Sequence, residues 1–151
     1  MKKSTFAANL QQQMRFIFFT LLSFSFFSCT DDNDLIPNVY VNFNIQLSSA
    51  EFSNLQAVGN SEYVTGGVKG IILYRYDFDT FLAFDRACSF RPSIDCERVK
   101  IDNKTGTTLL TDSCCGSKFL ITDGYPIEGS ALLPLKRYNT SFDGENISVF
   151  N

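Results

Sequence analysis

The sequence of 151 residues contains no histidine. Histidine is the side chain that most often acts as a general base near neutral pH, and its imidazole is the commonest metal ligand. Every catalytic arrangement built on it is therefore excluded. A G-x-S-x-G nucleophile turn and a glycine-rich phosphate loop are also absent from the sequence. We expect no enzymatic activity, with chemistry by aspartate and glutamate alone as the alternative that the sequence leaves open.

The sequence also lacks an apolar run long enough to cross a bilayer comfortably. The longest run covers 16–28 and is followed at once by the polar stretch TDDND, whereas a spanning helix needs about 20 apolar residues. A basic start, an apolar run and the lipobox-like sequence FSC ending at Cys29 are typical of a lipoprotein signal peptide. We predict a signal peptide over 1–28, with Met1 and Met14 both plausible starts.

Lipid attachment at Cys29 would anchor the protein to a membrane without spanning it. Each buried acyl methylene contributes about 0.8 kcal/mol of membrane affinity, so several chains hold firmly. Residues 29–38 are polar and acidic with a proline and are interpreted as a tether, and 39–151 as one domain.

The charge of the mature chain limits its partners. Removal of the signal peptide leaves ten basic against sixteen acidic residues, a net charge near −6, which argues against nucleic acid and anionic lipid as partners. The acidic cluster after Cys29 is similar to the surface-export signals of some Gram-negative lipoproteins. We therefore expect a bacterial cell-envelope protein, lipid-anchored at the outer membrane on its periplasmic or surface face. The sequence does not identify a protein partner.

The periodicity of the domain predicts an all-β fold of short strands. Residues 40–47 alternate between apolar and polar, and no stretch sustains the 3.6-residue period of an amphipathic helix. Hairpins are predicted at 70–87 with its turn at 77–79, at 98–110 with its turn at 103–106, and at 137–150 with its turn at 143–144. Such domains usually close into an antiparallel barrel or sandwich.

The sequence also predicts one short helical turn and the burial of an aromatic segment. The weak helical candidate is 48–58, where Ser48 or Ser49 could cap a short turn. The aromatic residues of 74–84 are expected in the core, except Phe78, which lies at a turn between two aspartates.

Four cysteines remain in the domain: Cys88, Cys96, Cys114 and Cys115. Export places them where disulfides persist, so crosslinks are the first interpretation. A four-thiolate metal site is the second, although the adjacent cysteines do not easily both face one ion, and C-x-x-C is the usual spacing. A reactive thiol pair is the third, without a C-x-x-C motif or a histidine to lower a thiol pKa.

Several motifs together resemble the Rieske-type [2Fe-2S] domain. They are CSF at 88–90, DSCCGSKF at 112–119, DGYPIEGSALLPLKRY at 123–138 and the closing DGENISVFN at 143–151. In that family one loop carries C-x-H, a second carries C-x-x-H-G-S, and a third carries G-P-A followed by P-L. The resemblance covers about 80–151 and implies an antiparallel β-barrel or sandwich with a hairpin-loop subdomain.

The resemblance also fixes where the family's cluster ligands would lie. Cys88 matches the first cysteine, Phe90 the first histidine, Asp112 the second cysteine and Cys115 the second histidine. A Rieske centre needs two thiolates on one iron and two imidazoles on the other. Phe90 offers no lone pair, and Asp112 is a hard oxygen donor poorly matched to iron-sulfide. We therefore expect no cluster, no other metal and no cofactor; Ser117, at the position of a serine that hydrogen-bonds the cluster, is expected to be a turn residue.

Some Rieske proteins join their two cluster loops by a disulfide, and the resemblance implies Cys96–Cys114 as its counterpart here. Cys88 and Cys115 are then left at two former ligand positions and are expected to form a second bridge. By loop-closure entropy each bridge would stabilise the domain by about 3 kcal/mol.

The function expected from these features is a non-enzymatic, lipid-anchored structural or interaction module of the cell envelope, with a Rieske-like fold and no cluster. The alternative is an electron-transfer protein that keeps a remodelled iron-sulfur or other metal site on Cys88, Cys96, Cys114 and Cys115.

Overall fold

The fold is built on a hairpin, β3 (Ile71–Arg75) and β4 (Phe81–Asp85), that is buried on both faces. The protein is seen in a computed structural model, which describes residues 35–102 and 109–151. Successive strand side chains point to opposite faces, and accordingly Ile72 and Ile71 belong to two different hydrophobic cores. The continuous apolar runs of both strands reflect this burial on two sides.

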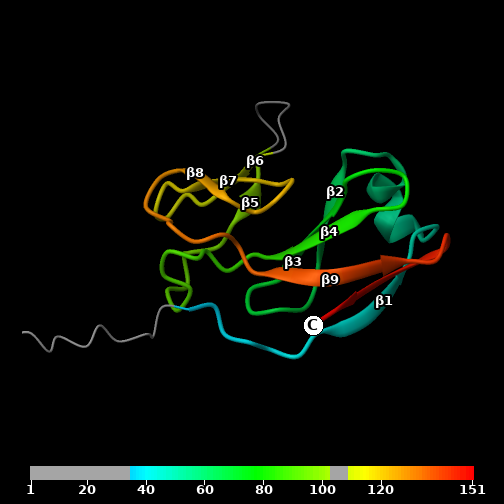
Figure 1. Ribbon diagram of the computed structural model, residues 1–151, viewed down its shortest axis with the longest axis horizontal. Coiled ribbons are helices and arrows are strands. Elements are labelled where there is room, and N and C mark those ends of the chain that lie inside the picture. Colours follow the sequence, from blue (N-terminus) through cyan, green and yellow to red (C-terminus); the bar gives the residue numbers. More distant parts are fainter. Residues whose placement is uncertain (1–34, 103–108) are drawn as a thin grey trace, which may run out of the picture. The chain divides into compact units, whose positions relative to one another are not determined.

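Two antiparallel sheets contain all the strands of the described residues (Figure 1). The larger has the order β1-β10-β9-β4-β3-β2, where β1 is Asn42–Gln46, β2 is Ser61–Val64, β9 is Arg137–Phe142 and β10 is Asn146–Phe150. The smaller has the order β5-β6-β7-β8, where β5 is Lys100–Ile101, β6 is Leu109–Thr111, β7 is Lys118–Leu120 and β8 is Pro126–Glu128. The smaller sheet is therefore an insertion in the chain between β4 and β9.

Each face of the central hairpin packs against a different part of the chain. On one face, the core side chains come from the smaller sheet and its connections, among them Val99, Leu110, Phe119, Ile121 and Leu135. On the other, they come from the remaining strands of the larger sheet and from the helix η1 (Ala50–Gln56), among them Val41, Leu55, Tyr138, Ile147 and Val149. The first core also contains Cys88, so it supports the cysteine-bearing loops.

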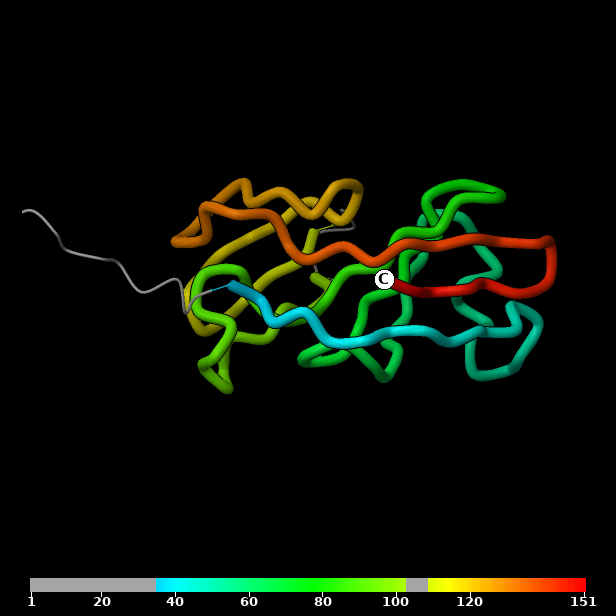
Figure 2. The backbone as a smooth tube through the Cα atoms, turned by 60° about the horizontal axis from the view of Figure 1, so that its bottom comes forward, coloured from blue at the N-terminus to red at the C-terminus, as the bar shows by residue number. Residues whose placement is uncertain are grey.

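The last hairpin, β9–β10, joins the first strand to the hairpin at the centre. Figure 2 shows β10 and β1 running side by side, and their register pairs Phe43 with Val149 and Ile45 with Ile147. Strand β9 in turn pairs with β4 through Ala83 and Tyr138. The alternation predicted for 40–47 places the core side chains of β1 on one face, as expected for a half-buried strand.

A buried carboxylate at the end of β4 fixes the start of the next loop. Asp85 Oδ2 accepts hydrogen bonds from the Val68 N–H at 2.6 Å and the Tyr138 hydroxyl at 2.8 Å, and Oδ1 accepts one from the Ala87 N–H at 2.7 Å. Burial, together with the neighbouring Asp85, raises the pKa of the Tyr138 hydroxyl. This network positions the backbone one residue before Cys88.

The predicted turns are found where the structure describes them. Asp77 Oδ1 accepts hydrogen bonds from two following N–H groups, and Phe78 is 78% exposed, as expected. Tyr76, which was expected in the core, is 49% exposed. Asp143 does the same in the β9–β10 turn, where Gly144 has a φ of +97°. These hydrogen bonds to the carboxylates lower the pKa of Asp77 and of Asp143.

The weak helical candidate is the 3₁₀ helix η1, with Ser49 at the N-cap position but without a side-chain capping hydrogen bond. The all-β prediction is confirmed, and the hairpins at 70–87 and 137–150 are formed. The predicted signal peptide at 1–28, Cys29 and the turn predicted at 103–106 lie outside the described residues. Within the described part of the chain, no helix is long and apolar enough to cross a membrane.

Candidate functional site

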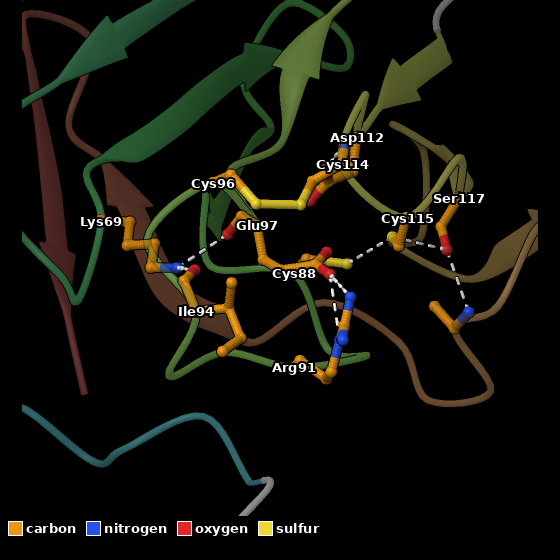
Figure 3. A network of polar contacts seen from close by, with 11 residues as sticks. Lys69, Cys88, Arg91, Ile94, Cys96, Glu97, Asp112, Cys114, Cys115 and Ser117 are labelled. Carbon is orange, nitrogen blue, oxygen red and sulfur yellow. Dashed lines mark hydrogen bonds and ion pairs between the residues drawn. A yellow bond between two sulfur atoms is a disulfide. The ribbon is translucent and has the colours of Figure 1, made fainter.

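The cysteines come together where two loops of the structure meet (Figure 3). The first loop, 86–99, connects β4 to β5, and the second, 112–117, connects β6 to β7. A disulfide between Cys96 and Cys114 joins them, with a Cα–Cα distance of 5.7 Å. The pairing implied by the resemblance is therefore confirmed, and these two sulfurs are not available as thiolate ligands.

The second loop is a tight turn organised by Asp112. Its backbone carbonyl accepts a hydrogen bond from the Gly116 N–H at 2.9 Å, and its Oδ1 accepts one from the Cys114 N–H at 2.7 Å. Gly116 has a φ of +73°, a conformation that favours glycine. Ser117 Oγ accepts a hydrogen bond from the Ala131 N–H at 2.9 Å, so it ties the loop to the segment after β8. Ser117 was expected only as a turn residue; its side chain is fully buried and connects two segments.

The second expected bridge, Cys88–Cys115, is not formed in the structure. The two Sγ atoms lie 3.5 Å apart, and neither is bonded to another described cysteine. Cys115 Sγ also lies 3.1 Å from Ser117 Oγ, to which it donates. Burial raises the pKa of the Cys88 thiol well above its usual range, and the neighbouring Cys115 and Asp112 raise it further. A hydrogen bond from the Phe90 backbone lowers this pKa but does not outweigh the increase.

A buried glutamate, Glu97, faces the two thiols from the first loop. Arg91 donates to its Oε1 from Nη2 at 3.0 Å and from Nε at 3.3 Å. The Glu97 side chain is fully buried, whereas that of Arg91 is 47% exposed and its guanidinium lies over the Phe90 ring. Lys69 Nζ donates to the Glu97 carbonyl at 2.9 Å and to the Ile94 carbonyl, which holds the loop against the larger sheet.

Sequence reasoning did not single out Glu97. It is one of sixteen acidic residues, and no motif distinguishes it from the exposed ones. The only signal was its position directly after Cys96, a cysteine expected in a bridge that closes this loop.

Two buried carboxylate oxygens at this place have no hydrogen-bond partner among the described residues: Glu97 Oε2 and Asp112 Oδ2. Burial raises the pKa of Asp112, and the Glu97 carboxylate adds to the increase. Burial alone would also raise the pKa of Glu97, but the Cys115, Arg91 and Asp112 side chains outweigh it and lower the pKa. The pair therefore favours an ionised Glu97 beside an Asp112 that is more readily protonated.

The ligand positions implied by the resemblance do not fit a Rieske-type [2Fe-2S] cluster. The chain offers no imidazole, and Phe90 is partly buried with its ring packed against the core beneath the loops. Cys88, Asp112 and Cys115 do lie together, but with Glu97 in place of a fourth family ligand. The arrangement can bind cations through two thiols and two carboxylates; it does not offer the two imidazoles of a Rieske centre.

No protein-family model matches the chain, and no curated protein matches it.

Proposed function

We propose that this protein is a lipid-anchored protein of the bacterial cell envelope whose Rieske-like domain carries no [2Fe-2S] cluster and acts as a non-enzymatic interaction module. The observation that carries the proposal is the side chains at the ligand positions that the resemblance implies: the chain has no imidazole, and Phe90, which has no lone pair, packs against the core at one of these positions. The Cys96–Cys114 disulfide joins the two loops that carry these positions. A covalent crosslink of this kind holds a small loop pair in shape without an inorganic centre.

The surroundings of the loops support a role in protein contact. Large apolar side chains are exposed along the segment after β7: Tyr125, Ile127, Leu132 and Leu133, with Leu132 at 90%. The Ser89 hydroxyl donates to the Leu133 carbonyl at 2.5 Å, so this apolar rim is fixed to the first cysteine loop. Exposed apolar side chains grouped in one segment are candidates for a contact site, and rigid support lowers the entropic cost of binding.

The cluster-free part of the proposal is tested on protein purified from membranes of cells that produce the full chain. We expect colourless protein without stoichiometric iron or acid-labile sulfide. Visible absorption together with stoichiometric iron and sulfide would contradict the proposal and favour the electron-transfer alternative.

The contact role is tested in intact cells by a photo-crosslinking side chain at position 132, with position 78 as the matched control. Phe78 is also apolar and exposed, but it lies at the β3–β4 turn. We expect one discrete protein adduct from position 132, weakened by Leu133→Asp, and none from position 78. Equal patterns at the two positions would contradict a contact role for the apolar rim.

A further inference from the structure

Four side chains from the two loops converge on one buried point. The described residues Cys88, Glu97, Asp112 and Cys115 each offer a ligand atom, a thiol sulfur or a carboxylate oxygen, and these four atoms lie within 4.8 Å of one another. Figure 3 shows the four side chains on the two facing loops. Cys88, Glu97 and Asp112 are buried, and Cys115 is partly buried. From this convergence we propose that the four side chains form a binding site for a single divalent cation, with Zn²⁺ as the ion that fits best.

The unpaired oxygens are the independent observation that points to a ligand. Glu97 and Asp112 are 0% and 1% exposed, and one carboxylate oxygen of each lacks a hydrogen-bond partner among the described residues. A buried polar atom without a partner is costly, and native structures usually provide one. In the metal-free protein a proton on Asp112 would join the two oxygens. A cation between the two carboxylates would replace that proton and bind both oxygens.

The geometry agrees with tetrahedral coordination. A zinc ion bonded at about 2.3 Å to sulfur and about 2.0 Å to oxygen separates its ligand atoms by roughly 3.3–3.8 Å. The two sulfur atoms lie 3.5 Å apart, and the widest separation among the four atoms is within 4.8 Å. The widest pair therefore has to approach by at most about 1.5 Å for the four atoms to close on one ion.

The donor set selects the class of metal. Thiolates disfavour Mg²⁺ and Ca²⁺, which prefer all-oxygen sites, and the two carboxylates disfavour Cu⁺, which prefers soft sulfur ligands. Zn²⁺ accepts sulfur and carboxylate oxygen in the same tetrahedral shell. Since four protein ligands fill that shell, the site is closed and its role is structural.

Neighbouring groups already orient the proposed ligands. Arg91 holds one oxygen of Glu97 and the Cys114 N–H holds one oxygen of Asp112, so in each carboxylate the other oxygen is left free. Ser117 Oγ lies 3.1 Å from Cys115 Sγ and can donate its hydroxyl proton once the sulfur is a thiolate. Such outer partners are a regular feature of metal sites.

Zinc binding exchanges protons for the metal ion. Zn²⁺ enters, the two thiols release their protons to solvent, Asp112 releases any proton it carries, and no electron is transferred. The site differs from a cluster in holding one ion, in needing no sulfide, and in using Glu97, which is at none of the ligand positions implied by the resemblance. The inference does not depend on the membrane anchor or on the contact role.

The test uses protein purified from membranes of cells that produce the full chain, stripped with a chelator and titrated with Zn²⁺ alone. We expect one zinc per chain, a higher midpoint of thermal unfolding, and protection of Cys88 and Cys115 from alkylation that a chelator reverses. Co²⁺ in place of Zn²⁺ is expected to show sulfur-to-metal charge-transfer absorption. These measurements need no variant, so they stand even if a substitution impairs folding.

Variants then assign the ligands. Cys88→Ser and Glu97→Gln are each expected to weaken zinc binding. Loss of a group that only orients a ligand costs about 10–100-fold in affinity, so loss of a ligand itself should cost at least that much. Glu128→Gln is the matched control, since Glu128 is exposed and paired with Lys118; it should bind zinc as the parent does.

Three results would overturn the inference. They are the lack of stoichiometric zinc binding, zinc binding unchanged by both ligand substitutions, and a Cys88–Cys115 disulfide in protein isolated from cells under thiol-trapping conditions. Each is distinguishable from failure of the proposed function, which would show as iron, sulfide and colour.

Discussion

Cys114 and Cys115 are neighbours in the chain, but their sulfur atoms have different partners. Cys114 is bonded to Cys96, whereas Cys115 Sγ lies 3.5 Å from Cys88 Sγ. Both residues lie in the tight turn 112–117, where the Cys114 sulfur meets the first loop at Cys96 and the Cys115 sulfur lies beside Cys88. One loop of six residues therefore supplies both a crosslink and a second, separate sulfur. The crosslink fixes the loop, and the separate sulfur completes the buried group of thiols and carboxylates.

The first prediction concerns this crosslink. Cys114→Ser should free Cys96 for alkylation while Cys88 keeps the protection that its burial gives. Closing a loop with a sequence separation of 18 stabilises a domain by about 3 kcal/mol, so the free energy of unfolding should fall by about that amount. Denaturant unfolding and mass spectrometry after alkylation measure both. Labelling of Cys88 in place of Cys96 would contradict the pairing.

The second prediction concerns the support of Glu97. Arg91→Met removes both donors to Glu97 Oε1 and leaves a buried carboxylate unpaired. We expect a loss of about 1–3 kcal/mol in the free energy of unfolding of the metal-free protein. The control, Lys118→Met, breaks an exposed pair with Glu128 and should cost only about 0–1 kcal/mol. Equal losses in the two variants would show that Glu97 does not need Arg91.

The strands could be predicted because their signal is local. Alternation in 40–47 and the aspartate-containing turns at 77 and 143 predict hairpins from neighbouring residues alone, and the structure has them. The partner of Cys114 followed from the resemblance, since it depends on which loops meet. Glu97 could not be found in this way. Its burial depends on Cys96, Arg91 and Lys69 acting together, and nothing local in the sequence encodes that convergence.

The third prediction is a pH dependence that comes from Tyr138. Its folded pKa is raised by burial and by Asp85, so the neutral hydroxyl is favoured in the folded state. The resulting stability is fully present below the unfolded tyrosine pKa of about 10 and is lost as the pH rises towards the folded pKa. Tyr138→Phe should lower stability at neutral pH by about 1.5–3 kcal/mol, because Asp85 loses a donor.

The same variant should also lose part of the alkaline sensitivity. Unfolding free energies at neutral and alkaline pH, compared with those of Tyr76→Phe, measure this effect. Tyr76 is half-exposed, so it serves as a matched control. An unchanged alkaline loss in Tyr138→Phe would contradict the assignment.

The fourth prediction concerns Cys29, which lies outside the described residues. If its thiol carries the lipid, Cys29→Ser should leave the protein unprocessed or release it from membranes. Fractionation and intact mass of the parent and the variant measure this. A Cys29→Ser protein that is still processed and membrane-bound would contradict the lipoprotein prediction.

The last prediction concerns Gly129, which follows β8 and packs against the second cysteine loop. It has a φ of +96°, and a Cβ at this position would lie 2.4 Å from Ser117 Cα and 2.7 Å from the Gly116 carbonyl oxygen. Both are backbone atoms, so they cannot move aside as the end of a flexible side chain can. Gly129→Ala should therefore displace the 112–117 loop as well as strain its own backbone.

Gly144→Ala is the matched control, since Gly144 has a φ of +97° and no atom within 4 Å of the added Cβ. Gly144→Ala should lower the free energy of unfolding only by the strain of an alanine in a left-handed conformation, about 1–2 kcal/mol. Gly129→Ala should lower it by a further ~1–3 kcal/mol because the added Cβ overpacks the loop. Displacement of the loop should also speed alkylation of Cys115 in Gly129→Ala but not in Gly144→Ala. Equal stabilities and equal alkylation rates would show that Gly129 does not hold the cysteine loop in place.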